Sequence, residues 1–340
     1  MKISPIEGLT VLITGGAGSF GTHFIETAFR LYAPKRIIVY SRDEWKHALC
    51  REKFRALYDA NKLEFFVGDV RDFERLTLAM RADVDVVIHA AALKRIDAVE
   101  YSPYEAVQTN IMGSWNVFRA AIEAKVAKVV ALSTDKAADA LNTYGVSKLM
   151  MERLCVQSNS YAGSGPTRLS CTRYGNVAGS RGSVIPLFRH QAATTGVLKV
   201  TDPAMTRFWM TLDDSVNLVH FALQQMRGGE VFIPLMRAFK LEDLVEAVAK
   251  EANLSPNTDY IRIVGPGPGE KLHESIVSPY ERPYCRCMYG NMILYPLYCS
   301  WSEVEMVGWP VKDNYRYLSS DVANKLSVEE LYTALGEVRE

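Results

Sequence analysis

Tyr144 and Lys148 stand four positions apart in the stretch ALSTDKAADALNTYGVSK (131–148), and such a pair could carry out redox chemistry. A helix would place both side chains on one face. We expect the lysine ammonium to lower the pKa of the phenol, because a nearby opposite charge favours the phenolate. A phenolate can take the proton of a sugar hydroxyl while a hydride leaves the same carbon for a nicotinamide. The alternative is a helix with one buried tyrosine and one surface lysine.

Four polar residues precede this pair. Ser133 and Thr134 close an apolar run, and Thr134 could hydrogen-bond the same hydroxyl. Asp135 and Lys136 are an adjacent carboxylate and ammonium, for which a simple oxidation has no use. They suit a reaction in which a ketone at carbon 4 of a sugar acidifies the proton at carbon 5. A base then removes that proton, and an acid expels the carbon 6 hydroxyl as water, each transfer gaining roughly 10²- to 10⁴-fold in rate. The alternative is a surface salt bridge.

Strands and helices that could position these groups alternate in the first half of the chain. Helical spacing of apolar residues, as in 23–32 and 106–124, separates short runs rich in Val, Ile and Phe, which are typical of strands buried on both faces. The alternation predicts an α/β fold with a doubly wound, parallel Rossmann sheet. Ligands bind outside the carboxyl ends of such strands, where residues 133–136 fall. The predicted strands are 9–14, 36–40, 64–68, 85–90, 128–133 and 168–174.

The alternation weakens after about residue 175, where Gly, Pro and Arg become frequent. We therefore predict an NADP-binding domain over 1–175, to which part of 206–235 returns, and a smaller C-terminal substrate-binding lobe over 176–340. The tail 319–338 predicts a closing helix, because Ser327 is followed three residues later by Glu330 and then by apolar spacing.

The glycine-rich stretch TGGAGSFG (14–21) predicts the cofactor site. It follows the first strand and opens a helix, so a pyrophosphate could bind at the helix N-terminus. An ordinary glycine-rich turn is the alternative. The residues expected to contact the dinucleotide here are Gly15, Gly18, Ser19, Phe20 and Gly21.

The residues after the second strand favour NADP over NAD. Ser41 occupies the position about 20 residues after the glycines where NAD enzymes carry an acid. Ser41 and Arg42 can hold a 2′-phosphate, and Lys46 can help. The alternative, with NAD, is that Arg42 lies on the surface and Asp43 binds the ribose. Analogy with the fold adds further cofactor contacts, namely Asp69, Val70, Ala90, Ala91, Ala92, Lys94 and Asn110.

Composition argues against several other classes of protein. The net charge of +0 gives no reason to expect nucleic acid or an anionic membrane as a partner. No run of about 18 apolar residues and no signal-peptide pattern occurs, so we expect a cytoplasmic protein. The six cysteines are typical of reduced thiols. Cys285 and Cys287, with Cys299, are too closely spaced for a usual zinc site, so we expect no metal.

Several stretches together resemble a known family. The sequence is similar to the UDP-N-acetylglucosamine 4,6-dehydratases, which are extended short-chain dehydrogenase/reductase enzymes, over roughly residues 8–275. The branch it resembles comprises the soluble, inverting enzymes that open pseudaminic acid biosynthesis. The resemblance rests on STDKAxxxxNxYGxSK, TGGAGSFG, IIVYSRDE, VGDVRD, HAAALK, RYGNVAGSRGSVIP, MTRFW and GEKLHE.

The resemblance implies a role for each candidate residue. Tyr144, assisted by Lys148, would serve oxidation at carbon 4. Asp135 would be the acid that expels the carbon 6 hydroxyl. Lys136 would be the base at carbon 5, where related deoxyhexose dehydratases use glutamate, and burial beside the nicotinamide would lower its pKa. NADP would stay tightly bound and be regenerated as hydride returns to carbon 6. The implied UDP-sugar site comprises Lys94, Tyr174, Asn176, Arg181, Ser183, Val184, Arg207 and Glu270.

The family also suggests how the substrate is held and how the chain assembles. Arg207 is the expected pyrophosphate clamp, because guanidinium matches phosphate geometry; a surface arginine is the alternative. The resemblance implies a homo-oligomer, from dimer to hexamer. The missing membrane anchor favours inversion at carbon 5, and Tyr144 argues against a soluble branch that carries methionine there.

The sequence departs from the family pattern before GEKLHE. Gly267-Pro268-Gly269 stands where the family carries Arg-Pro-Gly or Arg-Ala-Gly, so a phosphate-binding arginine is missing. Arg262 or Arg282 could replace it. The exact nucleotide sugar therefore stays open. Further departures are Arg95-Ile96-Asp97, Asp139-Ala140 and the stretch 280–296.

Two other functions stay open at this point. A nucleotide-sugar 4-epimerase needs Tyr144, Lys148 and a cofactor, but no acid and base like Asp135 and Lys136. A non-catalytic NADP-binding sensor is the third hypothesis, and sensors of that kind tend to lose the tyrosine.

Overall fold

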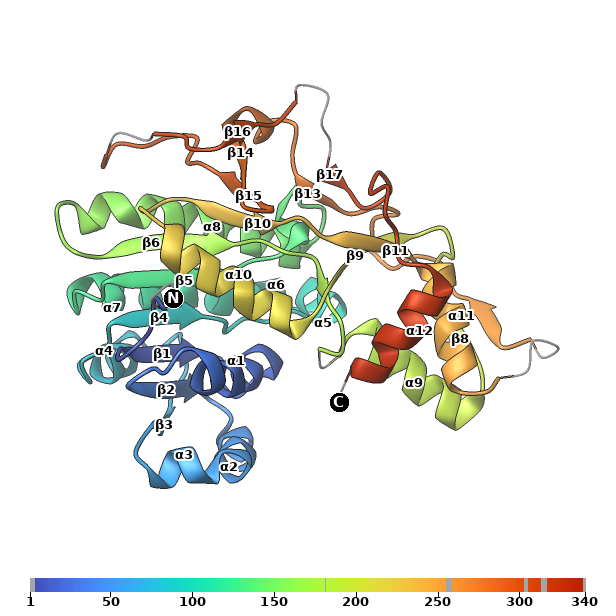
Figure 1. Cartoon of the computed structure of the whole chain (residues 1–340), viewed down its shortest axis with the longest axis horizontal. Helices are drawn as coiled ribbons and strands as arrows, with labels where there is room; N and C mark the ends of the chain where they lie inside the picture. Colours follow the sequence, from blue (N-terminus) through green and yellow to red (C-terminus); the bar gives the residue numbers. More distant parts are fainter. Residues whose placement is uncertain (1–3, 181, 255–258, 303–304, 313–316, 339–340) are drawn as a thin grey trace.

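A ten-stranded sheet forms the centre of the computed structural model, which describes residues 4–180, 182–254, 259–302, 305–312 and 317–338 (Figure 1). The strand order is β16-β14-β15-β10-β6-β5-β4-β1-β2-β3. The strands β10, β6, β5, β4, β1, β2 and β3 pair in parallel. β15, β14 and β16 extend the sheet beyond β10 by antiparallel pairing. The bounds are β1 Thr10–Thr14, β2 Arg36–Ser41, β3 Leu63–Val67, β4 Val86–His89, β5 Lys128–Leu132, β6 Arg168–Thr172, β10 Val231–Pro234, β14 Cys285–Met288, β15 Asn291–Leu294 and β16 Trp309–Pro310.

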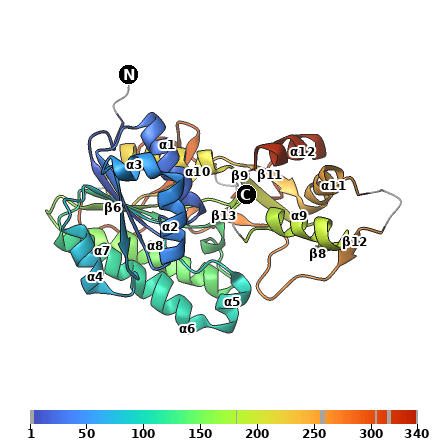
Figure 2. The same cartoon turned by 90° about the horizontal axis from the view of Figure 1, so that it is seen from below.

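Helices cover both faces of this sheet. Figure 2 shows α1 and α10 on one side and α4, α7 and α8 on the other. One turn of π-helix, Val107–Met112, precedes α7 inside the predicted helix 106–124. The helices are α1 Ser19–Leu31, α2 Glu44–Lys53, α3 Arg55–Asp59, α4 Phe73–Met80, α5 Ile96–Tyr101, α6 Pro103–Ala106, α7 Gly113–Glu123, α8 Thr143–Ala162 and α10 Leu212–Gln225, with 3-10 turns at Asp135–Ala137 and Arg282–Tyr284.

The predicted fold class is confirmed. All six predicted strands are present, as β1 to β6, and each is parallel to its neighbours. The apolar runs of the central strands are buried because helices pack on both faces, and every residue of β1 is buried. The edge strand β3 is only partly buried.

A second hydrophobic cluster forms the core of a lobe beside the sheet. It includes Phe188, Leu198, Phe239, Leu244 and Leu331. The predicted closing helix is α12, and its capping box is confirmed: the Ser327 side chain accepts from the Glu330 N–H, and the Glu330 side chain accepts from the Ser327 N–H. The other elements after residue 175 are α9 Val184–Thr195, α11 Leu241–Glu251, α12 Val328–Glu337, β7 Asn176–Val177, β8 Leu198–Val200, β9 Thr206–Met210, β11 Arg237–Lys240, β12 Ile261–Ile263, β13 Ser275–Val277 and β17 Tyr317–Leu318.

Two later stretches return to the large sheet. β10, within the range 206–235, pairs in parallel with β6. β14 and β15 form an antiparallel hairpin that continues the sheet beyond β10, and no strand was predicted there. The domain boundary after residue 175 stays a prediction.

A buried arginine ties β6 to α8 and to the segment after β13. The Arg173 guanidinium donates to the Glu152 carboxylate on α8 (Nε–Oε1 3.0 Å), to the Glu281 carboxylate (Nη1–Oε2 2.9 Å) and to the Ile276 carbonyl (2.9 Å). Burial raises the pKa of Glu281, but the charge of Arg173 outweighs burial and holds that pKa below its usual value. The arginine therefore fixes α8, which carries Tyr144 and Lys148.

Arg173→Ala should lower the free energy of unfolding by about 3–5 kcal/mol, because it leaves two carboxylates buried without a counter-charge. Urea denaturation of the full chain measures the loss. Arg55→Ala is the control, since Arg55 pairs with Asp59 at the exposed surface of α3, and such pairs change stability little. Equal losses in the two variants would contradict the role given to Arg173.

Candidate active site

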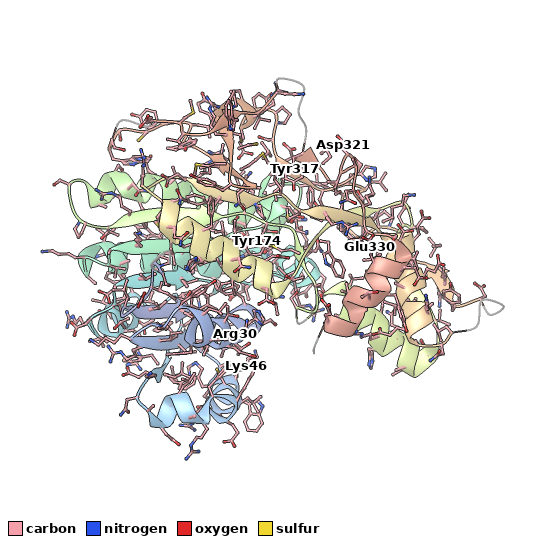
Figure 3. The ribbon with its side chains drawn as sticks, viewed as in Figure 1. Arg30, Lys46, Tyr174, Tyr317, Asp321 and Glu330 are labelled. Carbon is pink, nitrogen blue, oxygen red and sulfur yellow. The ribbon has the colours of Figure 1, made fainter. Side chains whose placement is uncertain are left out.

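A cavity of about 1500 Å³ lies where the carboxyl ends of the parallel strands face the lobe. Its wall includes the glycine-rich loop, the ends of β4 and β5, and residues of the lobe such as Arg207 and Glu274. Figure 3 shows two of its lining residues, Lys46 on α2 and Tyr174 after β6, on separate elements. This is the position that ligands take in open α/β sheets.

The glycine-rich loop leaves room for a phosphate at the start of α1. Gly15 has φ +68°, and a Cβ there would come within 2.9 Å of the backbone that follows β4. A Cβ at Gly21 would approach the Gly16 carbonyl oxygen to 2.2 Å, so α1 packs directly against the loop. Gly18 and Ser19 line the cavity at the helix N-terminus, where N–H groups can bind a pyrophosphate. The loop therefore fits a dinucleotide.

The residues that were predicted to select the dinucleotide also line the cavity. Lys46 Nζ lies 2.6 Å from the Asp43 carboxylate, which also accepts a hydrogen bond from the backbone at the start of α2. Arg42 Nη1 is 3.6 Å from the Asp69 carboxylate, and the arginine side chain is 56% exposed. The other predicted cofactor residues on the wall are Phe20, Ser41, Val70, Ala90, Ala91, Ala92 and Lys94.

Asn110 was predicted to contact the cofactor but lies behind the cavity wall. It is buried, and its side-chain amide donates to the Leu93 carbonyl (2.9 Å) and to the Ser147 hydroxyl (2.9 Å). Its carbonyl oxygen accepts from the Leu93 N–H (2.8 Å). Asn110 therefore holds the loop after β4 against α8.

His89 supports the same wall and was missed by the sequence analysis. Its ring nitrogens lie 2.7 Å from the Thr14 hydroxyl and 2.8 Å from the Ser114 hydroxyl. Burial lowers the pKa of His89 to about 3, and the charge of Lys148 adds to this, so the imidazole is neutral. The sequence shows only a histidine at the end of a buried strand, and nothing in it indicates that the ring bonds Thr14 and Ser114.

The five residues that were expected to do chemistry meet between β5 and the start of α8. The Asn142 side chain caps α8 by accepting from the Gly145 N–H (2.8 Å), and this fixes where the helix begins. Thr134, Lys136, Tyr144 and Lys148 line the cavity. The Asp135 side chain is 0% exposed and lies behind them, accepting from the Thr134 hydroxyl (2.9 Å) and from Lys136 Nζ (3.1 Å).

The expected effect of Lys148 on the tyrosine was wrong. Burial raises the pKa of Tyr144, and the charge of Lys136 and a hydrogen bond with Thr134 oppose that shift only in part. Lys148 Nζ donates instead to the Leu132 carbonyl (2.6 Å), and burial lowers the pKa of Lys148 to about 8. The cation that favours the phenolate is thus Lys136.

The expected low pKa of Lys136 was also wrong. Burial lowers this pKa, but the carboxylates of Asp135 and Glu274 outweigh burial and raise it above its usual value. Lys136 Nζ lies 3.3 Å from Glu274 Oε1, and Arg207 Nε lies 3.8 Å from the same oxygen. Glu274, which ends the GEKLHE stretch, is a site residue that the sequence analysis did not single out.

Opposite shifts separate the two carboxyl groups beside Lys136. Burial and the charge of Glu274 raise the pKa of Asp135, although the nearby Lys136 ammonium lowers it. The raised pKa favours the protonated acid. Burial also raises the pKa of Glu274, but Lys136 and Arg207 outweigh it and keep the group a carboxylate. The pKa values of the two carboxyl groups beside one ammonium are thus shifted apart, that of Asp135 upward and that of Glu274 downward.

The GEKLHE stretch docks on the segment that carries these groups. Asn142 Nδ2 donates to the Gly269 carbonyl (3.0 Å), and Lys271 Nζ donates to the Ala138 carbonyl (2.9 Å). Arg207 Nη1 donates to the carbonyls of Thr206 (2.8 Å) and Leu272 (3.2 Å). The expected phosphate clamp is therefore partly engaged with backbone.

Most residues that were predicted to bind the substrate line the cavity. Arg181 lies outside the described residues. The buried side-chain oxygens of Asn176 (Oδ1) and Ser183 (Oγ) have no hydrogen-bond partner among the described residues, which suits a polar ligand. Arg262 and Arg282, the suggested replacements for the missing arginine, do not line the cavity, whereas Lys199 and Lys271 do. The predicted substrate residues on the wall are Lys94, Tyr174, Asn176, Ser183, Val184, Arg207 and Glu270.

Two features are absent from the described part of the chain. No helix there is both long enough and apolar enough to cross a membrane. No cluster of three or more His, Cys, Asp or Glu side chains there could hold a metal ion.

Comparison with known proteins gives a consistent picture. A family model described as polysaccharide biosynthesis protein matches residues 11–293. A UDP-N-acetylglucosamine 4,6-dehydratase (inverting) of Campylobacter jejuni subsp. jejuni serotype O:23/36 (strain 81-176) is 41% identical over 334 residues, covering 96% of each chain. A UDP-glucose 4-epimerase of Rickettsia typhi is 43% identical over 272 residues, covering 79% of this chain and 77% of that one.

A solved structure supports the same architecture. The X-ray structure of Pen from Bacillus thuringiensis superposes with a TM-score of 0.89 at 35% sequence identity, covering 98% of both chains. The chain is thus similar to the Campylobacter jejuni dehydratase and to Pen along almost its whole length.

Proposed function

We propose that this chain, which belongs to the polysaccharide biosynthesis protein family, is a UDP-N-acetylglucosamine 4,6-dehydratase. The observation that carries the proposal is the ion pair of Asp135 and Lys136 close to Tyr144, with Lys136 and Tyr144 on the wall of the dinucleotide cavity and Asp135 buried directly behind it. Oxidation alone would leave such a pair without a task. The inverting relative at 41% identity supports a product inverted at carbon 5.

The residues divide the reaction among them. A bound nicotinamide dinucleotide supplies the hydride acceptor at carbon 4 and the hydride donor at carbon 6. Tyr144 takes the proton of the carbon 4 hydroxyl, and Thr134 hydrogen-bonds the same oxygen. Asp135 then protonates the leaving carbon 6 hydroxyl, and Lys136 faces the proton at carbon 5. The raised pKa of Asp135 suits an acid, because it favours the protonated form that can give up a proton.

The cavity also suits the nucleotide part of the substrate. Four basic side chains on its wall can balance the charge of a diphosphate. Lys199 and Lys271 provide this charge in a chain that lacks the arginine expected at position 267. The four are Lys94, Lys199, Arg207 and Lys271.

We also propose NADP as the cofactor, retained through each cycle. Ser41, Arg42 and Lys46 lie together on the cavity wall after β2. Asp43, the acid that could otherwise bind the ribose of NAD, already caps α2 and pairs with Lys46. Lys46 can leave Asp43, and Arg42 can leave Asp69, to bind a 2′-phosphate at little cost in free energy, because both ion pairs lie near the solvent.

A 4-epimerase is the second candidate, because the Rickettsia typhi relative is named a UDP-glucose 4-epimerase. An epimerase needs Tyr144 and the cofactor, and it removes no proton from carbon 5. The buried Asp135 and Lys136 therefore favour the dehydratase.

Purified full-length protein, incubated with UDP-N-acetylglucosamine in deuterated water without added cofactor, should give a 4-keto-6-deoxy product with deuterium at carbon 5. NMR of the sugar identifies the product and its configuration. Lys136→Ala should abolish the elimination while the cofactor stays bound. A 4-epimer without deuterium would show that the dehydratase assignment is wrong.

Arg42→Ala should weaken NADP binding by about tenfold or more, which corresponds to 1.4 kcal/mol, and leave NAD binding almost unchanged. The reason is that a guanidinium can contact the 2′-phosphate that NAD lacks. Calorimetric titration with each nucleotide measures the ratio of the dissociation constants for NADP and NAD. Arg71→Ala is the matched control, since Arg71 also pairs with Asp69 but does not line the cavity. A ratio that stays unchanged in Arg42→Ala would refute NADP selection at this position.

A further inference from the structure

Glu274 is the one carboxylate of the lobe that reaches the acid and base within the described residues. Its side chain is 4% exposed and lines the cavity, and its Oε1 lies 3.3 Å from Lys136 Nζ. The other oxygen, Oε2, is buried and has no hydrogen-bond partner in the described part of the chain. An ordinary structural ion pair would satisfy both oxygens, because an unpaired buried acceptor costs stability.

The backbone holds Glu274 rigidly in this position. Its N–H donates to the Ser319 hydroxyl (2.9 Å). That hydroxyl in turn bonds the Thr206 hydroxyl (2.6 Å) and the Thr206 carbonyl (3.1 Å). Thr206 is the neighbour of Arg207, the second cation at Oε1. Three segments that are remote in the sequence thus converge on one carboxylate.

Asp135 and Lys136 cannot complete the proton transfers alone. The elimination requires Asp135 as a neutral carboxylic acid and Lys136 as a neutral amine at the same time. The ordinary pKa values, about 3.9 for Asp and 10.4 for Lys, favour a carboxylate and an ammonium instead. If the carbon 5 proton leaves before the carbon 6 hydroxyl, Asp135 still holds its own proton at that moment and cannot accept one from Lys136. An ammonium that is to take the carbon 5 proton must pass one of its own protons to a third group.

We propose that Glu274 is this third group, which accepts a proton from Lys136 as Lys136 removes the proton from carbon 5. The C5–H bond breaks, its electron pair forms the C5–C6 double bond, and the C6–O bond breaks to release water with the proton of Asp135. When hydride returns to carbon 6, carbon 5 takes a proton from Lys136, and Glu274 returns its proton to the amine. Tyr144 releases the proton that it took from the carbon 4 hydroxyl and Asp135 regains one, so the enzyme is restored. Lys136 thus remains an ammonium before and after each transfer.

This role rests on the proposed dehydration, and Glu274→Gln tests it, because the amide has the same shape but cannot accept the proton. On mixing with UDP-N-acetylglucosamine, the variant should oxidise carbon 4 and then stall. Reduced nicotinamide should accumulate on the enzyme, and turnover and carbon 5 deuterium exchange should fall by about 10²-fold or more. Absorbance of the nicotinamide and NMR of the sugar measure the two effects.

Glu230→Gln is the matched control. Glu230 is also buried and accepts from the Ser170 hydroxyl and the Gly228 N–H, but it does not line the cavity. We expect this variant to turn over like the wild type, without accumulating reduced nicotinamide. It separates the loss of a proton acceptor from the loss of any buried carboxylate.

The following results decide whether Glu274 accepts this proton. Wild-type turnover in Glu274→Gln would overturn the proposal, and so would loss of turnover without reduction of the nicotinamide, which indicates a structural role. If Glu274→Gln does not bind the cofactor, Glu274→Asp replaces it: slowed carbon 5 exchange with intact carbon 4 oxidation supports the proposal, and wild-type exchange overturns it. Absence of the 4-keto-6-deoxy product with the wild type would instead refute the dehydratase assignment.

Discussion

The ion pair between Lys136 and Glu274 is the contact on which the geometry of this site depends. It joins the end of β5 to the segment before β13, and Arg207 on β9 joins it from the lobe. Burying these charges is costly, and apolar residues would stabilise the fold at least as well. The cluster is therefore best explained by chemistry, since it raises the pKa of Asp135 and lowers that of Glu274 on either side of one ammonium.

The rest of the fold maintains this contact. The Asn142 cap fixes the start of α8, and the same side chain bonds the Gly269 carbonyl of the GEKLHE stretch. Arg173 also holds α8, through the Glu152 carboxylate. The parallel sheet supplies the common edge at which the cofactor loop and the acid–base groups meet, as expected for ligand sites in doubly wound sheets.

Local patterns in the sequence predicted the six parallel strands and the closing helix, because buried strands and capping boxes have short-range signatures. The same patterns predicted many of the residues that line the cavity, among them Gly15, Tyr144 and Lys148. The β14–β15 hairpin, the partner of Lys148 and the position of Glu274 were not predicted. The hairpin is local in sequence, but its pairing with β10 joins distant segments, and so does the contact of Glu274 with Lys136. The direction of the Lys136 pKa depends in part on Glu274, which only folding brings to Lys136.

The fate of the hydrogen at carbon 4 tests most directly whether oxidation, elimination and reduction occur in one site. The substrate carries deuterium at carbon 4 and carbon-13 in its sugar ring, and it is mixed with unlabelled UDP-N-acetylglucosamine. A cavity that retains its cofactor should place the deuterium at carbon 6 of the carbon-13 product alone, which mass spectrometry and NMR detect. Deuterium that stays at carbon 4, exchanges with water or appears in unlabelled product would contradict this mechanism.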